Sequence, residues 1–163
     1  MKIFNPATTA LLANVTEDDV NTITQKYLSL QQGQPAWQQE KLTDKLLRIK
    51  KFRQLLLTNI DMLALTLSQE VGKPLTQARN EIHGAVTRVD YFLAQAQQVI
   101  GDDLVHQSEE VSEILSYEPL GIIANISAWN YPYLVGVNVF IPALLWGNAV
   151  LYKPSEFATL TGQ

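Results

Sequence analysis

Hydrophobic residues recur at helical spacing through the first hundred positions of the chain. The first predicted helix begins near a capping box made by Thr16 and Asp19. Its apolar face is formed by Val20, Ile23, Tyr27 and Leu30. The segment 31–35, with the sequence QQGQP, predicts a loop after this helix.

A second apolar stripe runs from Leu42 to Leu67 in steps of three and four residues. It predicts an amphipathic helix with a break near Asn59. Gly72-Lys73-Pro74 predicts the end of this helix, and the apolar spacing from Leu75 to Val99 predicts another. Residues 1–100 are therefore expected to be mainly helical.

The cations of the second helix fall largely outside its apolar stripe. They are Lys45, Arg48, Lys50, Lys51 and Arg53. Such a cluster is compatible with a nucleic-acid patch, but a solvated helix face is the simpler interpretation. The net charge of -4 also argues against binding to a phosphate backbone, so no nucleic-acid partner is expected.

The pattern changes to alternation after a turn at residues 101–103. Residues 111–117 alternate as a strand does, with Glu113, Leu115 and Tyr117 facing one way.

Residues 119–156 predict a strand, a loop, a helix and a second strand. Ile122, Ile123 and Ile126 are β-branched, which favours a buried strand of a parallel sheet. Asn130 precedes Tyr131 and Pro132 and is expected to cap the helix. Gly147 predicts the helix end and Pro154 the end of the second strand, which covers 149–152. The carboxyl ends of both strands would lie at one sheet edge, where ligands bind in α/β proteins.

The long uncharged run from Tyr131 to Tyr152 raises the alternative of a membrane span. It contains Asn138, Asn148 and two prolines, so a helix and a strand buried in an α/β core are favoured and no membrane partner is expected. The N-terminus has no apolar stretch typical of a secretory signal. The chain has no cysteine, which excludes disulfides and suits a cytoplasmic protein. Its two histidines match no metal motif.

Four clusters in the C-terminal run match one known family in order and spacing. They are Pro119-Leu120-Gly121, Trp129-Asn130-Tyr131-Pro132, Pro142-Ala143-Leu144 with Gly147-Asn148, and Lys153-Pro154-Ser155-Glu156. The chain resembles the aldehyde dehydrogenases, NAD(P)-dependent enzymes that oxidise aldehydes to carboxylic acids through a cysteine thioester. Asn5-Pro6-Ala7-Thr8, Trp37 and Glu70-Val71-Gly72-Lys73-Pro74 extend the match upstream. One departure is Ala128, where the family usually has proline.

The resemblance implies a single partial α/β domain over residues 1–163. Helices in 1–100 would lead into a Rossmann-like cofactor domain, of which 119–163 form the first βαβ unit. Residues 101–118 would supply a strand of the oligomerisation sheet, which a strand from the far end of the family's chain completes. Because that partner strand is absent from these residues, the edge is expected to be unpaired, and an unpaired strand edge is a site for association with another chain. The sequence stops short of the family's catalytic cysteine, its general-base glutamate and the glycine-containing turn for the cofactor pyrophosphate. A thioester mechanism needs a thiolate, so this N-terminal portion is expected to be inactive alone.

The resemblance also assigns roles to residues of the two loops. It makes Asn130 the amide donor to the oxyanion of the tetrahedral intermediate, with a plain helix cap as the alternative. It places Ser127, Ala128, Trp129, Lys153, Ser155 and Glu156 at the cofactor. Lys153 and Glu156 would hold the adenosine ribose, and Glu156 favours NAD over NADP because a carboxylate repels a 2′-phosphate. By charge alone these two would be ordinary surface residues, and Trp129 could be a core anchor.

Tyr131, Leu134 and Asn138 match positions of the family's substrate tunnel, with helix packing as the alternative. An aldehyde substrate would bind only in a complete enzyme. A second hypothesis is an assembly module, which pairs with a separately encoded C-terminal chain or forms a homo-oligomer, since a lone βαβ unit leaves apolar faces uncovered.

Overall fold

A computed structural model describes residues 1–163 as a mixed α/β chain. The N-terminal part consists of β1 (Lys2–Phe4), β2 (Leu11–Asn14), α1 (Val20–Gln39), α2 (Leu42–Thr58), α3 (Ile60–Val71) and α4 (Leu75–Val99). A second hairpin follows, made of β3 (Asp103–Gln107) and β4 (Ser112–Leu115). The C-terminal part consists of β5 (Ile122–Ile126), α5 (Pro132–Leu145), β6 (Ala149–Lys153) and α6 (Thr159–Gly162).

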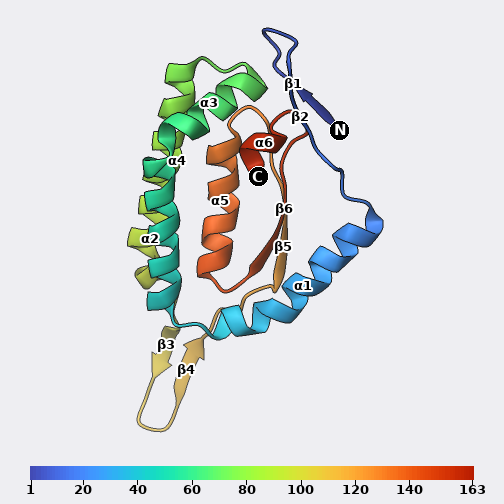
Figure 1. Cartoon of the computed structure of the whole chain (residues 1–163). Helices are drawn as coiled ribbons and strands as arrows, with labels where there is room; N and C mark the ends of the chain where they lie inside the picture. The colour runs from blue at the N-terminus through green and yellow to red at the C-terminus, as the bar shows by residue number, and fades with distance from the viewer.

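Helices and sheet form layers, with α5 in the middle (Figure 1). α2 and α4 pack on one side of α5, and the pair β5–β6 packs on its other side. α1 lies against the opposite face of this sheet. One cluster of buried side chains joins α2, α4 and α5, and its largest members are Leu46, Ile49, Val89, Val137, Ile141 and Leu145. A second joins α2, α3 and α4 around Leu56, Leu67 and Ile82.

The predicted strand, helix and strand of the C-terminal run are confirmed. β5 and β6 pair in parallel from Ile122 opposite Ala149 to Ile126 opposite Lys153. Gly147, at φ 91°, ends α5 in a conformation that side chains with a Cβ rarely adopt. The two strands therefore finish at the same sheet edge, which brings the loop after β5 beside the loop after β6.

The predicted break at Asn59 and the stop at Gly72 are also confirmed, because α3 begins at Ile60 and ends at Val71. The predicted loop at 31–35 is wrong, since α1 continues through Gly33 and Pro35 to Gln39. Tertiary bonds hold this last part of the helix: Gln34 Nε2 donates to the Gly147 carbonyl at 3.0 Å, and Trp37 Nε1 to the Leu144 carbonyl at 2.9 Å.

The capping box of α1 also lies three residues later than predicted. Asp19 is the N-cap and Thr22 its partner, and each side chain accepts a backbone N–H of the other residue at 2.8 Å. Thr16 plays no part in this cap. The predicted apolar face of α1 does not form a core, because the helix contains no buried residue.

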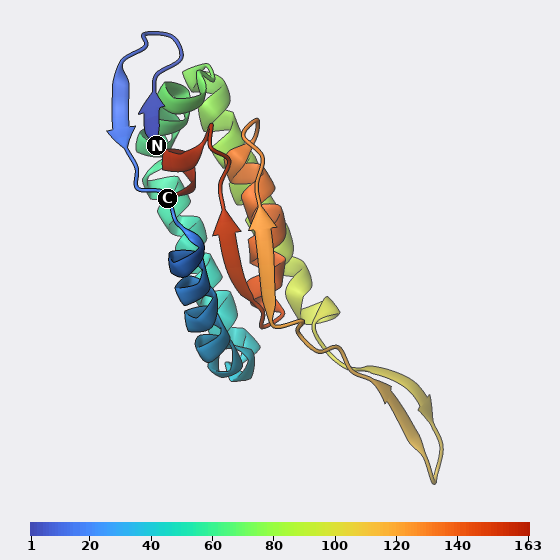
Figure 2. The ribbon, with the colours of Figure 1, turned by 90° about the vertical axis from the view of Figure 1, so that its right-hand side faces the viewer.

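The predicted strand at 111–117 is shorter than expected, and it is paired along one edge, while its other edge has no partner strand. β4 covers Ser112–Leu115 and pairs antiparallel with β3, which the sequence pattern did not indicate. The hairpin β3–β4 extends away from the layered body, and every residue in its strands is exposed (Figure 2). The first hairpin, β1–β2, was not predicted either.

The uncharged run 131–152 does not form one long helix. α5 has 14 residues, and β6 follows it as a separate strand. None of the helices combines the length and hydropathy that crossing a bilayer requires.

Candidate functional site

Two loops meet at the carboxyl ends of the parallel strands, and they carry most of the predicted site residues. The Ser127 amide donates to the Lys153 carbonyl at 3.0 Å and so extends the strand pairing. Beyond it the Trp129 and Phe157 rings pack edge to face, with centroids 6.3 Å apart. Segment 127–131 is therefore adjacent to segment 153–157. Trp129 is 52% exposed, which excludes the core-anchor interpretation.

Asn130 occupies the turn between β5 and α5, but it is not the helix cap. Tyr131 is the N-cap residue, and no side chain of the loop caps the helix. Asn130 Oδ1 instead accepts the Tyr131 amide at 3.1 Å. The Nδ2 group of this exposed residue has no hydrogen-bond partner in the chain. It is thus available to donate to an oxygen atom of a ligand.

A buried ion pair outside the two loops supports this turn. Lys73, in the α3–α4 connection, bonds to the Glu81 carboxylate of α4. Lys73 Nζ also donates to the Asn130 carbonyl at 2.6 Å, and Glu81 Oε1 accepts the Tyr133 amide at 2.9 Å. From the sequence, Lys73 was assigned to a helix stop and to a motif of the family resemblance, without a role at the site, and Glu81 was not identified. A charged residue on the predicted apolar side of α4, between Ala78 and Ile82, was the available signal.

Tyr133 anchors the first turn of α5 to the helical layer. Its hydroxyl donates to the Leu63 carbonyl at 3.1 Å, and its ring packs against both core clusters. Burial raises the pKa of the Tyr133 phenol, and the nearby Glu81 and Glu70 carboxylates raise it further. The side chain is therefore a neutral packing residue at physiological pH.

Lys153 and Glu156 lie together after β6 and are open to solvent. Their charged atoms are 3.6 Å apart, and the side chains are 59% and 60% exposed. A bond from its own backbone amide lowers the pKa of Glu156, and the Lys153 charge contributes to the same direction. An ionised carboxylate beside an ammonium group offers acceptors and donors for hydroxyl groups, so the pair fits a ribose.

The other predicted residues of the two loops differ in their exposure. Ala128, between Ser127 and Trp129, is exposed. Ser127 and Ser155 are buried. Ser155 Oγ accepts the Phe157 amide at 3.2 Å, so this hydroxyl shapes the loop.

The three tunnel candidates, Tyr131 before α5 and Leu134 and Asn138 within it, are not equivalent. Tyr131 and Asn138 are exposed, and the Tyr131 ring lies 4.0 Å from Lys73 Nζ. Leu134 is half-buried and packs against the cluster that joins α2, α4 and α5. The packing interpretation therefore describes Leu134, whereas Tyr131 and Asn138 present accessible side chains.

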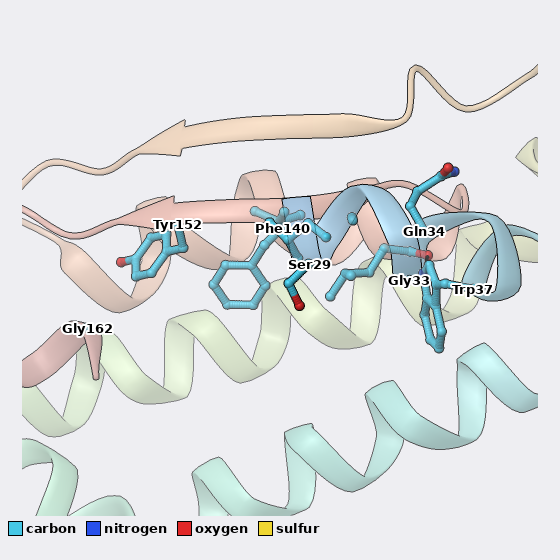
Figure 3. Close-up of a pocket in the computed structure, with 11 residues that line it drawn as sticks. Ser29, Gly33, Gln34, Trp37, Phe140, Tyr152 and Gly162 are labelled. Atoms are coloured by element: carbon cyan, nitrogen blue, oxygen red, sulfur yellow. Dashed lines mark hydrogen bonds between the residues drawn. The ribbon is translucent and has the colours of Figure 1, made fainter. Parts of the chain in front are cut away.

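A mostly hydrophobic groove lies outside the two loops. It has a volume of about 530 Å³ and separates α1 from α5 and β6, with Trp37, Phe140 and Tyr152 among its lining residues (Figure 3). Most of the lining is hydrophobic, and none of the predicted site residues belongs to it. The two loops, not this groove, therefore form the candidate site.

Comparison with known proteins gives the same assignment along the whole chain. The model of the aldehyde dehydrogenase family matches residues 1–163. The chain is 29% identical over 161 residues to 3,6-anhydro-alpha-L-galactose dehydrogenase of Streptomyces coelicolor, which covers 99% of this chain and 32% of that protein. It spans about a third of the length of the relatives that it matches.

Solved structures of the family share the fold. Aldehyde dehydrogenase from Brucella melitensis biovar abortus superposes with a TM-score of 0.93 at 25% identity, over 98% of this chain and 33% of that one. Succinate-semialdehyde dehydrogenase from Burkholderia pseudomallei superposes with a TM-score of 0.91 at 26% identity, over 99% and 33% of the two chains. Other solved structures that it resembles are complexed with NAD or with NADP. The chain matches the first third of these folds from end to end, and it belongs to the aldehyde dehydrogenase family.

Proposed function

We propose that this chain supplies the oxyanion donor and the ribose-binding pair of an NAD-dependent aldehyde dehydrogenase. The observation that carries the proposal is the parallel pairing of β5 and β6, which sets Asn130 and the Lys153–Glu156 pair at one sheet edge. Substrate and cofactor could therefore meet across this edge.

The proposed role of Asn130 is electrostatic. Attack of a thiolate on an aldehyde turns the carbonyl oxygen into an oxyanion, and a preset N–H donor stabilises that charge by about 3 kcal/mol in the transition state. The free Nδ2 group of Asn130 supports this role. The 163 residues contain no cysteine, so the nucleophile has to come from outside them. The general base would come from there as well.

The cofactor role belongs to Lys153 and Glu156. NAD would accept the hydride of the substrate, and the Glu156 carboxylate would accept bonds from the ribose hydroxyls. Its negative charge disfavours the 2′-phosphate of NADP, so NAD is the preferred cofactor. Exposed Tyr131 and Asn138 would face the aldehyde. The segment between Asn130 and Lys153 has no cation that could bind an acidic aldehyde.

Titration of the 163-residue chain with NADH, followed by fluorescence, tests the cofactor role. We expect weak saturable binding that is lost in the double variant Lys153→Ala/Glu156→Ala. The matched control is Lys26→Ala/Asp18→Ala, which removes another exposed ion pair far from the two loops. Equal binding by the double variant and the unaltered chain, or no binding by either, would overturn the assignment.

An activity assay tests whether the nucleophile comes from another chain while this chain supplies the oxyanion donor. Aldehyde and NAD added to the pure 163-residue chain should produce no NADH, because the chain has no thiol nucleophile. Robust turnover by the pure chain would contradict the proposal. Activity that appears with a cysteine-bearing partner and falls about 100-fold in Asn130→Ala would support it.

A second candidate function is assembly with a separately encoded C-terminal chain. β5 and β6 form a two-stranded sheet with a free edge on each side, and such edges accept further strands. Native mass spectrometry of the protein, gently purified from the cells that produce it, distinguishes the candidates. A second polypeptide with a cysteine would support the split enzyme, and the 18.3 kDa chain alone or in copies would exclude it.

A further inference from the structure

The ion pair between Lys73 and Glu81 lies in an unusual place for two opposite charges. The Glu81 side chain is fully buried and that of Lys73 is 11% exposed. Burial of charges costs free energy, and pairing in the interior often does no more than offset that cost. The pair therefore calls for an explanation other than stability, and its remaining hydrogen bonds provide one.

Glu81 replaces the missing local cap of α5. Tyr131, at the N-cap position, makes no side-chain cap, and Pro132 has no N–H. The Tyr133 amide is the next donor of the first turn and has no carbonyl partner within the helix. It donates to Glu81 Oε1 at 2.9 Å, while Glu81 Oε2 bonds to Lys73. The negative charge also suits the positive end of the helix dipole.

Lys73 contacts the two residues that precede Pro132, which are Asn130 and Tyr131. Its ammonium group bonds to Glu81, donates to the Asn130 carbonyl at 2.6 Å and lies 4.0 Å from the centre of the Tyr131 ring. The Lys73 side chain thus contacts both Asn130 and Tyr131. The pair consequently fixes the main chain from the Asn130 carbonyl to the Tyr133 amide.

We propose that Lys73 and Glu81 are positioning residues that hold the Asn130 donor in place. The importance of this positioning for catalysis rests on the proposed function. The effect of Lys73 and Glu81 on the Asn130 turn, however, is measurable in the chain without cofactor or substrate. Failure of the NADH or activity tests would leave the positioning result intact. A negative result in the test below would not affect the assignment of Lys153 and Glu156 to the ribose.

The Tyr133 amide is a direct reporter of the Glu81 bond, and NMR hydrogen exchange measures it. Lys73 and Tyr133 bond to different oxygen atoms of Glu81, and glutamine presents an oxygen at only one of these two positions. In Glu81→Gln we expect the oxygen to face the ammonium group, so Tyr133 exchange should rise roughly 10- to 100-fold. Exchange at Ile141 and Leu145, deep in the same helix, should stay within about threefold of the unaltered chain, since their own hydrogen bonds remain.

The backbone and side-chain amides of Asn130 report on Lys73. In the unaltered chain we expect 15N order parameters near 0.85, typical of rigid backbone, at Asn130. In Lys73→Met they should fall below about 0.6. If this variant does not unfold cooperatively in urea, the neutral double variant Lys73→Met/Glu81→Gln replaces it, and the same loss is expected.

A charge exchange separates positioning from a merely structural ion pair. Lys73→Glu/Glu81→Lys restores an opposite-charge pair, but the carboxylate at position 73 could not donate to Asn130, and the ammonium group at position 81 could not accept from Tyr133. We expect the exchanged chain to keep fast Tyr133 exchange and low Asn130 order. Recovery of unaltered values in it would overturn the proposal. Single variants that lower protection evenly along α5, with Asn130 still rigid, would overturn it as well.

Discussion

At the scale of single residues, two buried asparagines show that the surroundings of a side chain determine its effect on stability. Asn148 uses both ends of its side chain: Oδ1 accepts the Gly121 amide at 3.0 Å, and Nδ2 donates to the Ala143 carbonyl at 3.2 Å. It thus ties the start of β5 to the end of α5. Asn125, on β5, is as deeply buried, but its Nδ2 group has no partner. Replacing the side-chain amide by an apolar group should therefore have opposite effects at the two positions.

We expect Asn125→Val to raise the free energy of unfolding by about 1 kcal/mol, because an unpaired buried amide is replaced by apolar surface. Asn148→Val should lower it by about 2 kcal/mol, because two backbone groups lose their partners. Urea unfolding of both variants, with the slope m compared to that of the unaltered chain, measures the effects. Destabilisation by both substitutions would show that Asn125 has a role that its contacts do not reveal.

At the scale of elements, the sequence pattern predicted correctly those helices and strands whose limits are determined by neighbouring residues. β-branched residues, Gly147 and Pro154 marked β5, the end of α5 and the end of β6, and the parallel edge followed from them. The motif residues Asn130, Lys153 and Glu156 could be located for the same reason. Their roles came from the family resemblance. Charge and spacing alone would also have allowed Asn130 to be a helix cap and Lys153 and Glu156 to be an ordinary surface pair.

Elements that depend on distant contacts were not predictable. The end of α1 contains glycine and proline, and it stays helical because Gln34 and Trp37 bond to carbonyls more than one hundred residues away. The unpredicted strand β3 is short and solvent-exposed on both faces, so burial imposes no alternation on it. Lys73 and Glu81 reach Asn130 and Tyr133 across more than fifty residues of sequence. No local pattern could have connected them to the site.

The short helix α6 depends in the same way on a residue of another element. Glu70, at the end of α3, accepts the Leu160 amide and the amide and hydroxyl of Thr161, each at 2.8 Å. We expect Glu70→Ala to lower the free energy of unfolding by about 3 kcal/mol, because three donors lose a charged acceptor. Hydrogen exchange at residues 159–162 should accelerate most.

The control for this experiment is Glu40→Ala. Glu40 pairs with Arg48 at the surface, at 3.2 Å, and an exposed pair of this kind contributes only about 0.5 kcal/mol. Urea unfolding of both variants gives the comparison. A cost at Glu70 no larger than the cost at Glu40 would show that α6 holds its place through packing alone.

At the scale of the whole molecule, the hairpin β3–β4 stands apart from the layered body (Figure 2). Its two strands and their flanks expose six large hydrophobic side chains, which are Leu104, Val105, Val111, Ile114, Leu115 and Tyr117. Each strand has one edge without a partner. Exposed apolar surface on an open strand edge favours association with another chain.

We therefore expect the chain to self-associate through this hairpin, and its unfolding midpoint in urea to rise with protein concentration, as mass action requires for an oligomer. Leu104 and Ile114 are paired neighbours in the hairpin, 60% and 56% exposed. The variant Leu104→Lys/Ile114→Lys should sediment as a monomer with a concentration-independent midpoint, because charges on an edge strand oppose pairing. Leu47→Lys/Met62→Lys, at positions 62% and 60% exposed on α2 and α3, is the matched control and should associate as the unaltered chain does. If both double variants dissociate equally, or the unaltered chain sediments as a monomer at every concentration, the hairpin is not the association surface.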